Sequence, residues 1–249
     1  MKLKIFLLVI LLFAFTCQAD KIFAGSIEGK VELIKKLPRR APKRYPDRPG
    51  TPGRKLEKVP AAVFVQGKVN GIGVPAQPKD LLMKQKETSF QPSLLFVALG
   101  TSVEFLNLDD EFHNVFSYSK TKRFDLGRYP NGESKSVIFD KPGIVKIYCE
   151  IHEWMRAAVI VVENPFHSVV SERGNFFLEN VPPGNYSIAV WSIDQGSKVV
   201  SMEVSPSGQD KIGIELSKKA KPMFKSLVLY VKQVSGNVVI KGKKKSSSK

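Results

Sequence analysis

Residues 94–119 read LLFVALGTSVEFLNLDDEFHNVFSYS, and this stretch decides the fold class. It contains three short apolar runs, separated by Gly100 and by the acidic turn Asp109-Asp110: 94–99, 102–108 and 114–119. None of these runs has the apolar period of an α-helix. Short strands broken by turn residues at this spacing are typical of a β-sandwich or a barrel.

The same pattern extends in both directions along the chain. After the turn signals Asn131-Gly132 and Pro142-Gly143, we expect further strands at 136–139, 145–149 and 157–162. A second series is expected at 176–181, 186–191, 198–204, 211–216, 227–233 and 237–242, and two earlier strands at 25–34 and 61–69. The sequence therefore predicts an all-β protein.

The distribution of charge and proline divides the chain into five segments. The net charge of +16 lies outside the middle of the chain, since 91–163 and 164–217 are slightly acidic. Proline recurs among cations in 37–60, which no sheet or helix interior tolerates. We predict these segments: a signal peptide at 1–19, N-terminal strands at 20–84 that include the insertion 37–60, β-domains at 85–163 and 164–217, and a basic segment at 218–249.

The N-terminus has the features of a secretory signal. Lys2 and Lys4 precede an 11-residue apolar run at 5–15, and Ala19 provides a small residue at a cleavage site. The run is shorter than the roughly 20 residues that span a bilayer, so an uncleaved anchor is the less favoured alternative. Cys17 could instead carry a lipid, although the residues before it form a poor lipobox. We predict an exported, periplasmic protein.

The segment YCEIHEWM at 148–155 carries the chemistry. It places Cys149, His152 and Met155 at C-x2-H-x2-M spacing, and His113 opens an upstream strand. A thiolate, two imidazoles and a thioether are the ligands of a blue-copper electron-transfer site. The chain has two Cys and three His, so most of them fall in this pattern, with His167 outside it. The sequence predicts one type 1 copper ion.

Around this motif the chain resembles the cupredoxins. The stretches NLDDEFHNVFSYSKTKRFDLGRY and SVIFDKPGIVKIYCEIHEWM are similar to plastocyanin/amicyanin-like proteins of the methylamine-utilization type. The segment ERGNFFLENVPPGNYSIAVW resembles a carboxypeptidase-regulatory-like, or transthyretin-like, β-domain. The resemblance implies a cupredoxin Greek-key β-sandwich followed by a transthyretin-like β-sandwich.

The same resemblance implies roles for individual residues. His113, Cys149, His152 and Met155 correspond to the copper ligands, and Asn114 to the asparagine that joins the two ligand loops by hydrogen bonds. One position departs from the family pattern: Ser93 stands where a histidine often follows the F-x-P segment.

We expect His152 to be the electron port, with Phe112, Ile151 and Trp154 as an apolar docking patch around it, although core packing between the two β-domains fits Trp154 equally well. The expected partner is a redox protein such as a c-type cytochrome or a dehydrogenase.

Other classes of function are less well supported by the sequence. It shows no nucleophile–base pair, no paired carboxylates and no phosphate loop that would indicate an enzyme. The alternatives are a copper carrier without electron transfer and a structural envelope protein. Export and the absence of a nucleic-acid module argue against nucleic-acid binding, and the basic segments better fit an anionic envelope surface.

Overall fold

The structure is a computed structural model of the chain, and it describes residues 25–33, 59–74, 77–78, 81–204, 209–216, 229–234 and 237–242. The segment 1–19 with Cys17, most of the insertion 37–60 and most of the basic segment 218–249 lie outside this range. All regular elements in the described ranges are strands, as expected for an all-β protein. None of the described residues belongs to a helix able to span a membrane.

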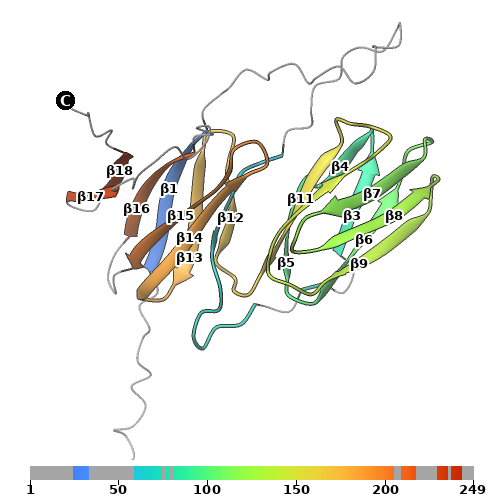
Figure 1. Cartoon of the computed structure of the whole chain (residues 1–249). Helices are drawn as coiled ribbons and strands as arrows, with labels where there is room; N and C mark the ends of the chain where they lie inside the picture. The colour runs from blue at the N-terminus through green and yellow to red at the C-terminus, as the bar shows by residue number, and fades with distance from the viewer. Residues whose placement is uncertain are drawn as a thin grey trace, which may run out of the picture.

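The strands form four sheets stacked in layers, which make up two β-sandwiches (Figure 1). Sandwich I comprises a five-stranded sheet in the order β5-β11-β10-β7-β8 and a four-stranded sheet in the order β4-β3-β6-β9. Its strands are β3 (Leu81–Lys86), β4 (Ser89–Gln91), β5 (Leu94–Ala98), β6 (Thr101–Asn107), β7 (His113–Tyr118), β8 (Arg123–Tyr129), β9 (Ser134–Phe139), β10 (Gly143–Tyr148) and β11 (Arg156–Val162).

Sandwich II also has two sheets, with the orders β12-β2-β14-β15 and β13-β1-β16-β18-β17. Its strands are β1 (Gly25–Leu33), β2 (Ala62–Val65), β12 (His167–Val169), β13 (Asn175–Val181), β14 (Gly184–Ser192), β15 (Gly196–Val204), β16 (Gln209–Leu216), β17 (Leu229–Val234) and β18 (Asn237–Gly242). Because β1 and β2 pair with later strands, sandwich I is inserted in the sequence between β2 and β12.

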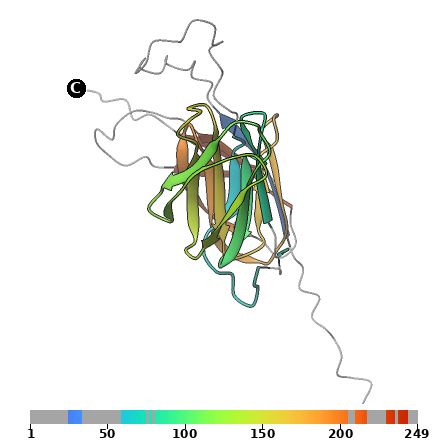
Figure 2. The same cartoon turned by 90° about the vertical axis from the view of Figure 1, so that its right-hand side faces the viewer.

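Alternating side chains build three hydrophobic cores between the four layers. On β11, Ala157, Val159 and Val161 face the core inside sandwich I, whereas Ala158, Ile160 and Val162 face a core shared with sandwich II. Sandwich II contributes Phe64, Ala189 and Trp191 to that shared core, and it has a third core of its own between its two sheets. The two sandwiches therefore pack face to face, and Figure 2 views the stack from one end with its strands overlapping.

The predicted strand positions agree with the structure to within a few residues, except that 61–69 contains only the four-residue β2. Four strands were not predicted: β3, β4, β8 and β12. Strand β8 (RFDLGRY) packs Phe124 and Leu126 against the core of sandwich I and buries Tyr129, but its other four residues are charged residues and a glycine, which weaken the sequence signal of a strand. His167, in the short β12, stacks on Phe96 with ring centroids 4.2 Å apart.

Three strand ends meet at one end of sandwich I. Strand β7 begins at His113, β10 ends at Tyr148 and β11 begins at Arg156. The antiparallel pairing places Tyr148 opposite both Phe116 and Arg156, so these ends are neighbours across the sheet. The residues between β10 and β11, Cys149 to Met155, therefore form a loop beside the start of β7.

Candidate metal centre

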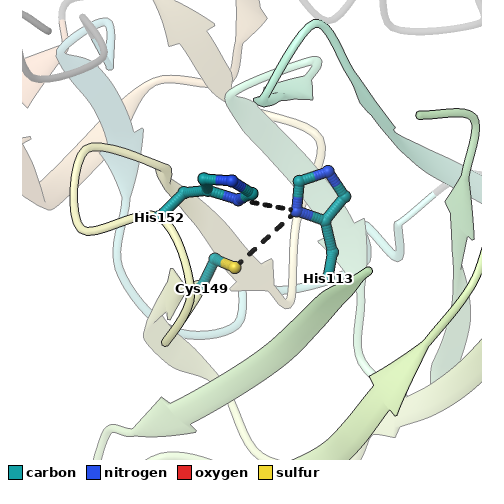
Figure 3. Close-up of side chains that lie close together, drawn as sticks. All are labelled: His113, Cys149 and His152. Carbon is teal, nitrogen blue, oxygen red and sulfur yellow. Dashed lines mark hydrogen bonds between the residues drawn. The ribbon is translucent and has the colours of Figure 1, made fainter. Parts of the chain in front are cut away.

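His113, Cys149 and His152 lie together at this end of sandwich I, with their ligand atoms all within 4.8 Å of one another. The Nδ1 atoms of His113 and His152 are 3.0 Å apart, and the Sγ of Cys149 is 3.8 Å from the Nδ1 of His113. Figure 3 shows the three side chains pointing toward one another, His113 from β7 and the other two from the loop. Their exposed fractions are 0%, 4% and 7%, so the donors converge in an enclosed site.

The loop that carries Cys149 and His152 is closed by its own backbone. The N–H of Met155 donates to the carbonyl of His152 at 2.9 Å, and the N–H of Cys149 donates to the carbonyl of Met155 at 3.4 Å. Met155 is fully buried, and it belongs to the same core cluster as Cys149. Cys149 and His152 are separated by two residues in this tight turn, and Met155 closes it. The loop therefore presents a compact set of donors.

Each histidine ring has a carboxylate at its other nitrogen. The Nε2 of His113 is 2.8 Å from Asp109, and the Nε2 of His152 is 2.8 Å from Glu111. Asp109 is itself held by the backbone N–H groups of Glu87 and Thr88, at 2.6 and 2.8 Å. Carboxylate partners of this kind orient a ligating imidazole and increase its basicity.

These contacts determine which ring nitrogens can bind a metal. A carboxylate only accepts hydrogen bonds, so the Nε2 atoms of both rings carry the proton. The Nδ1 atoms then face each other with their lone pairs, at 3.0 Å and beside a sulfur. Such an arrangement is favourable only with a cation between the donors, either a proton or a metal ion. The donor set therefore fits a metal, and soft sulfur with imidazole suits copper.

The surroundings of Cys149 favour the thiolate, the form that binds metal. Burial alone would raise the pKa of this thiol, but hydrogen bonds with His113 and with the backbone of Asn114, His152 and Ile151 hold the pKa below its ordinary value. Burial would lower the pKa of His113, and Cys149 together with Asp109 outweighs this and raises the pKa of the imidazole.

Asn114 connects the two parts of the site. Its side-chain oxygen accepts the backbone N–H of Glu150 at 2.6 Å, which ties the start of β7 to the loop after Cys149. Asn114 is only 2% exposed. The geometry is the one that the cupredoxin resemblance implies for this asparagine.

The three residues of the expected docking patch do not all face outward. Phe112 is 55% exposed and Ile151 38% exposed, both beside the ligands. Trp154 instead turns inward: it packs on the core of sandwich I, and its Nε1–H donates to the carbonyl of Thr88 at 3.2 Å. Phe112 and Ile151 are therefore the apolar residues available to a partner here.

Sequence reasoning missed the two carboxylates and expected a more exposed His152. The ring of His152 is nearly covered, and Glu111 occupies its outer nitrogen. The available signal was the acidic turn Asp109-Asp110-Glu111 just before His113, because carboxylates next to a ligand are candidates for its hydrogen-bond partners. The four predicted ligands lie together, positioned as the residues of a type 1 copper site.

Similarity to known proteins is found at the level of structure and over part of the chain. No family model and no curated protein matches the sequence. Among solved structures, the chain is similar to a copper-containing nitrite reductase from Thermus scotoductus SA-01, with 27% identity over 37% of this chain and a TM-score of 0.33. It spans about a quarter of that enzyme, 25% of its length.

Two smaller proteins are also similar over part of the chain. A reduced amicyanin variant shares 16% identity over 40% of this chain and 97% of its own, with a TM-score of 0.32. A purple cupredoxin from Nitrosopumilus maritimus shares 23% identity over 34% of this chain and 99% of its own, with a TM-score of 0.30. The copper assignment itself depends on the donor atoms of sandwich I.

Proposed function

We propose that this protein is an exported type 1 copper protein that transfers single electrons between redox partners. The observation that carries the proposal is the convergence of two Nδ1 atoms and one Sγ, with both Nε2 atoms engaged by carboxylates. Copper bound by these donors supplies one-electron chemistry between Cu(I) and Cu(II). His113, Cys149, His152 and Met155 would hold the ion, and Asn114 keeps the two parts of the site in register.

The enclosure of the site favours electron transfer over copper carriage. All four ligands are less than a tenth exposed, so release of an ion would require the loop to open. A carrier that hands over its metal needs accessible ligands, whereas an electron needs only a short path to the surface. Exposed Phe112 and Ile151 offer a small apolar contact for a partner such as a c-type cytochrome or a dehydrogenase, in keeping with weak redox encounters.

No catalytic role is part of the proposal. The sequence has three histidines, of which two are in this site and the third stacks on Phe96. A further copper cluster for oxygen or nitrite chemistry would need more of them. Export rests on the predicted signal at 1–19, and contact of the basic segment 218–249 with an anionic envelope surface is proposed from its charge alone.

The first experiment is copper binding to the protein lacking residues 1–19. Addition of Cu(II) should produce an intense absorption band at about 600 nm, which arises from coordination of copper by the thiolate. Cys149→Ser should abolish the band, and His167→Ala, a histidine outside the site, should retain it. A wild-type protein without the band would contradict the proposal.

A second experiment separates electron transfer from copper carriage. The copper-loaded protein is mixed with a reduced c-type cytochrome and, in parallel, with an apo copper acceptor. Reversible oxidation of the cytochrome with copper retained supports electron transfer. Loss of copper to the acceptor without cytochrome oxidation would favour the carrier.

A further inference from the structure

An ion pair joins sandwich II to the residue that directly follows the ligand loop. Arg156 directly follows Met155 in the chain, and its two terminal nitrogens lie 2.6 and 3.1 Å from the two carboxylate oxygens of Asp194. Asp194 belongs to the turn between β14 and β15 of sandwich II. A bidentate Arg–carboxylate pair fixes orientation as well as distance.

Arg156 occupies the copper end of the interface between the sandwiches. It is the first residue of β11, on the same face as Ala158 and Ile160, which pack in the shared core. The side chain of Arg156 is 13% exposed, so the pair is shielded from water on the arginine side. The side chain of Asp194 is 60% exposed, so the pair is strengthened only by the cover on the arginine and by its bidentate geometry.

Asp194 is held in place by sandwich II. The N–H of Asp194 donates to the Oγ of Ser192 at 3.4 Å, and the N–H of Gln195 donates to the carbonyl of Ser192 at 3.3 Å. Trp191, at the end of β14, is 2% exposed in the shared core. The carboxylate therefore projects from a fixed turn rather than from a free loop.

The ion pair reaches both ends of the ligand loop. Arg156 lies opposite Tyr148 in the β10–β11 pairing. Tyr148 precedes Cys149 and Arg156 follows Met155, so this one cross-strand pair marks the points where the loop leaves the sheet. A constraint on Arg156 is thus a constraint on the ends of the segment that holds three of the four ligands.

We propose that Asp194 is a positioning residue for the metal centre: through Arg156, sandwich II clamps the loop 149–155 and holds the Met155 thioether at the copper. This inference rests on the proposed function, since it concerns the same copper site. It gives sandwich II a role in setting the reduction potential of a centre that lies entirely in sandwich I.

The test compares Asp194→Asn and Arg156→Gln in the full-length, copper-loaded protein. A thioether favours Cu(I), so a less firmly held Met155 lowers the Cu(I):Cu(II) ratio in a fixed redox buffer, and we expect a decrease of about threefold in both variants. A through-space charge effect alone would move the ratio upward in Asp194→Asn and downward in Arg156→Gln, because the lost charges have opposite signs. A change in the copper EPR spectrum should accompany the decrease in both variants.

Arg156→Lys and Asp194→Glu are a second set of variants, which retain the charges but change the bidentate geometry of the ion pair. They should shift the ratio in the same direction, and they serve as the test if the first pair does not fold. The matched control is Asp140→Asn, which breaks the Lys122–Asp140 pair of 2.9 Å in the turns at the far ends of β9 and β7. It should leave the ratio and the spectrum unchanged.

Unchanged ratios, or shifts of opposite sign with an unchanged EPR spectrum, would overturn the positioning role while leaving the blue-copper proposal intact. Failure of the wild-type protein to form a type 1 site would instead overturn the proposed function, and this inference with it. The two failures are distinguishable because the second is visible before any variant is compared.

Discussion

Each ligating histidine uses its two ring nitrogens for different purposes. The Nε2 atoms face Asp109 and Glu111, and the Nδ1 atoms face each other and the sulfur of Cys149. The two carboxylates differ in exposure: the side chain of Asp109 is 13% exposed and that of Glu111 is 66% exposed. The ring of His113 is thus fixed from within the protein, whereas the ring of His152 is fixed from the surface.

Removal of the surface carboxylate should therefore change the redox balance without removing a ligand. In Glu111→Gln the Cu(I):Cu(II) ratio in a fixed redox buffer should rise by about two- to fivefold, because an exposed carboxylate stabilises the more positive ion by about 0.5–1 kcal/mol. Redox titration of the blue band measures this. Glu153→Gln, which removes an exposed carboxylate in the loop that carries His152, is the control; an equal shift there would show that only general charge matters.

The hydrogen bond from Asn114 should contribute to stability even in the metal-free protein. Asn114→Ala removes the buried side-chain oxygen that accepts the backbone N–H of Glu150 at 2.6 Å. We expect the free energy of unfolding to fall by about 1–3 kcal/mol. Urea unfolding of the metal-free protein measures it. Asn131→Ala, whose exposed amide contacts Asp110, should cost much less, and a comparable loss would contradict the assigned role.

The ligand residues could be recognised in the sequence because their types and spacing are rare together. Cys149, His152 and Met155 lie within one short loop, so their proximity needs no tertiary information. Glu111 could not be assigned in the same way, since its contact with His152 joins residues 41 positions apart by way of two loops. Contacts of that kind depend on how the loops meet across the sheet, which periodicity does not specify.

At the scale of the element, β11 links the metal centre to the rest of the molecule. It begins next to Met155, pairs with both β10 and β5, and is buried along nearly its whole length. Its sequence RAAVIVV is a continuous apolar run, which is expected when both faces of a strand are covered. A strand of this kind transmits a change in either sandwich to the ligand loop.

A cavity on the outer face of β11 should therefore be costly. Ile160→Ala removes a fully buried side chain from the core shared by the two sandwiches and should lower the free energy of unfolding by about 2–5 kcal/mol. Ile138→Ala, the same change at a position 58% exposed on β9, should stay within about 0.5 kcal/mol. Chemical denaturation of both variants tests this, and equal losses would argue against a packed interface.

Apolar alternation predicted most strands, and its failures have physical causes. The run 94–119 reveals three strands because each is a short apolar run bounded by turn residues. In β8 the apolar alternation of Phe124 and Leu126 stops at Gly127-Arg128, and β12 has only three residues, too few for a pattern. The sequence also could not show that β1 and β2 join strands more than a hundred residues later, because pairing across an insertion leaves no local signal.

At the scale of the whole molecule, the described strands form a stack of four sheets with three hydrophobic cores between the layers. The shared core includes Phe64 and Trp191 from sandwich II and Phe96 and Ile160 from sandwich I. An interface built like a domain interior, rather than like a polar contact between domains, couples the two units. This coupling is what allows a residue of sandwich II to influence a metal centre in sandwich I.

The two tryptophans allow a direct test of this coupling, since one lies in each sandwich. Trp154 packs on the core of sandwich I beside His152, with ring centroids 5.1 Å apart, and Trp191 packs in the shared core from sandwich II. In the single-tryptophan variants Trp191→Phe and Trp154→Phe, fluorescence follows the sandwich that retains its tryptophan.

Far-UV circular dichroism follows the strands of both sandwiches in the same variant. The two unfolding midpoints are compared within one variant, so a difference in stability between the two variants does not affect the result. We expect the fluorescence and dichroism midpoints in urea to coincide in both variants, because loss of either sandwich would expose the shared core and destabilise the other. Midpoints that differ between the two probes would show that the sandwiches unfold separately, and the clamp between Asp194 and Arg156 would then have no rigid support.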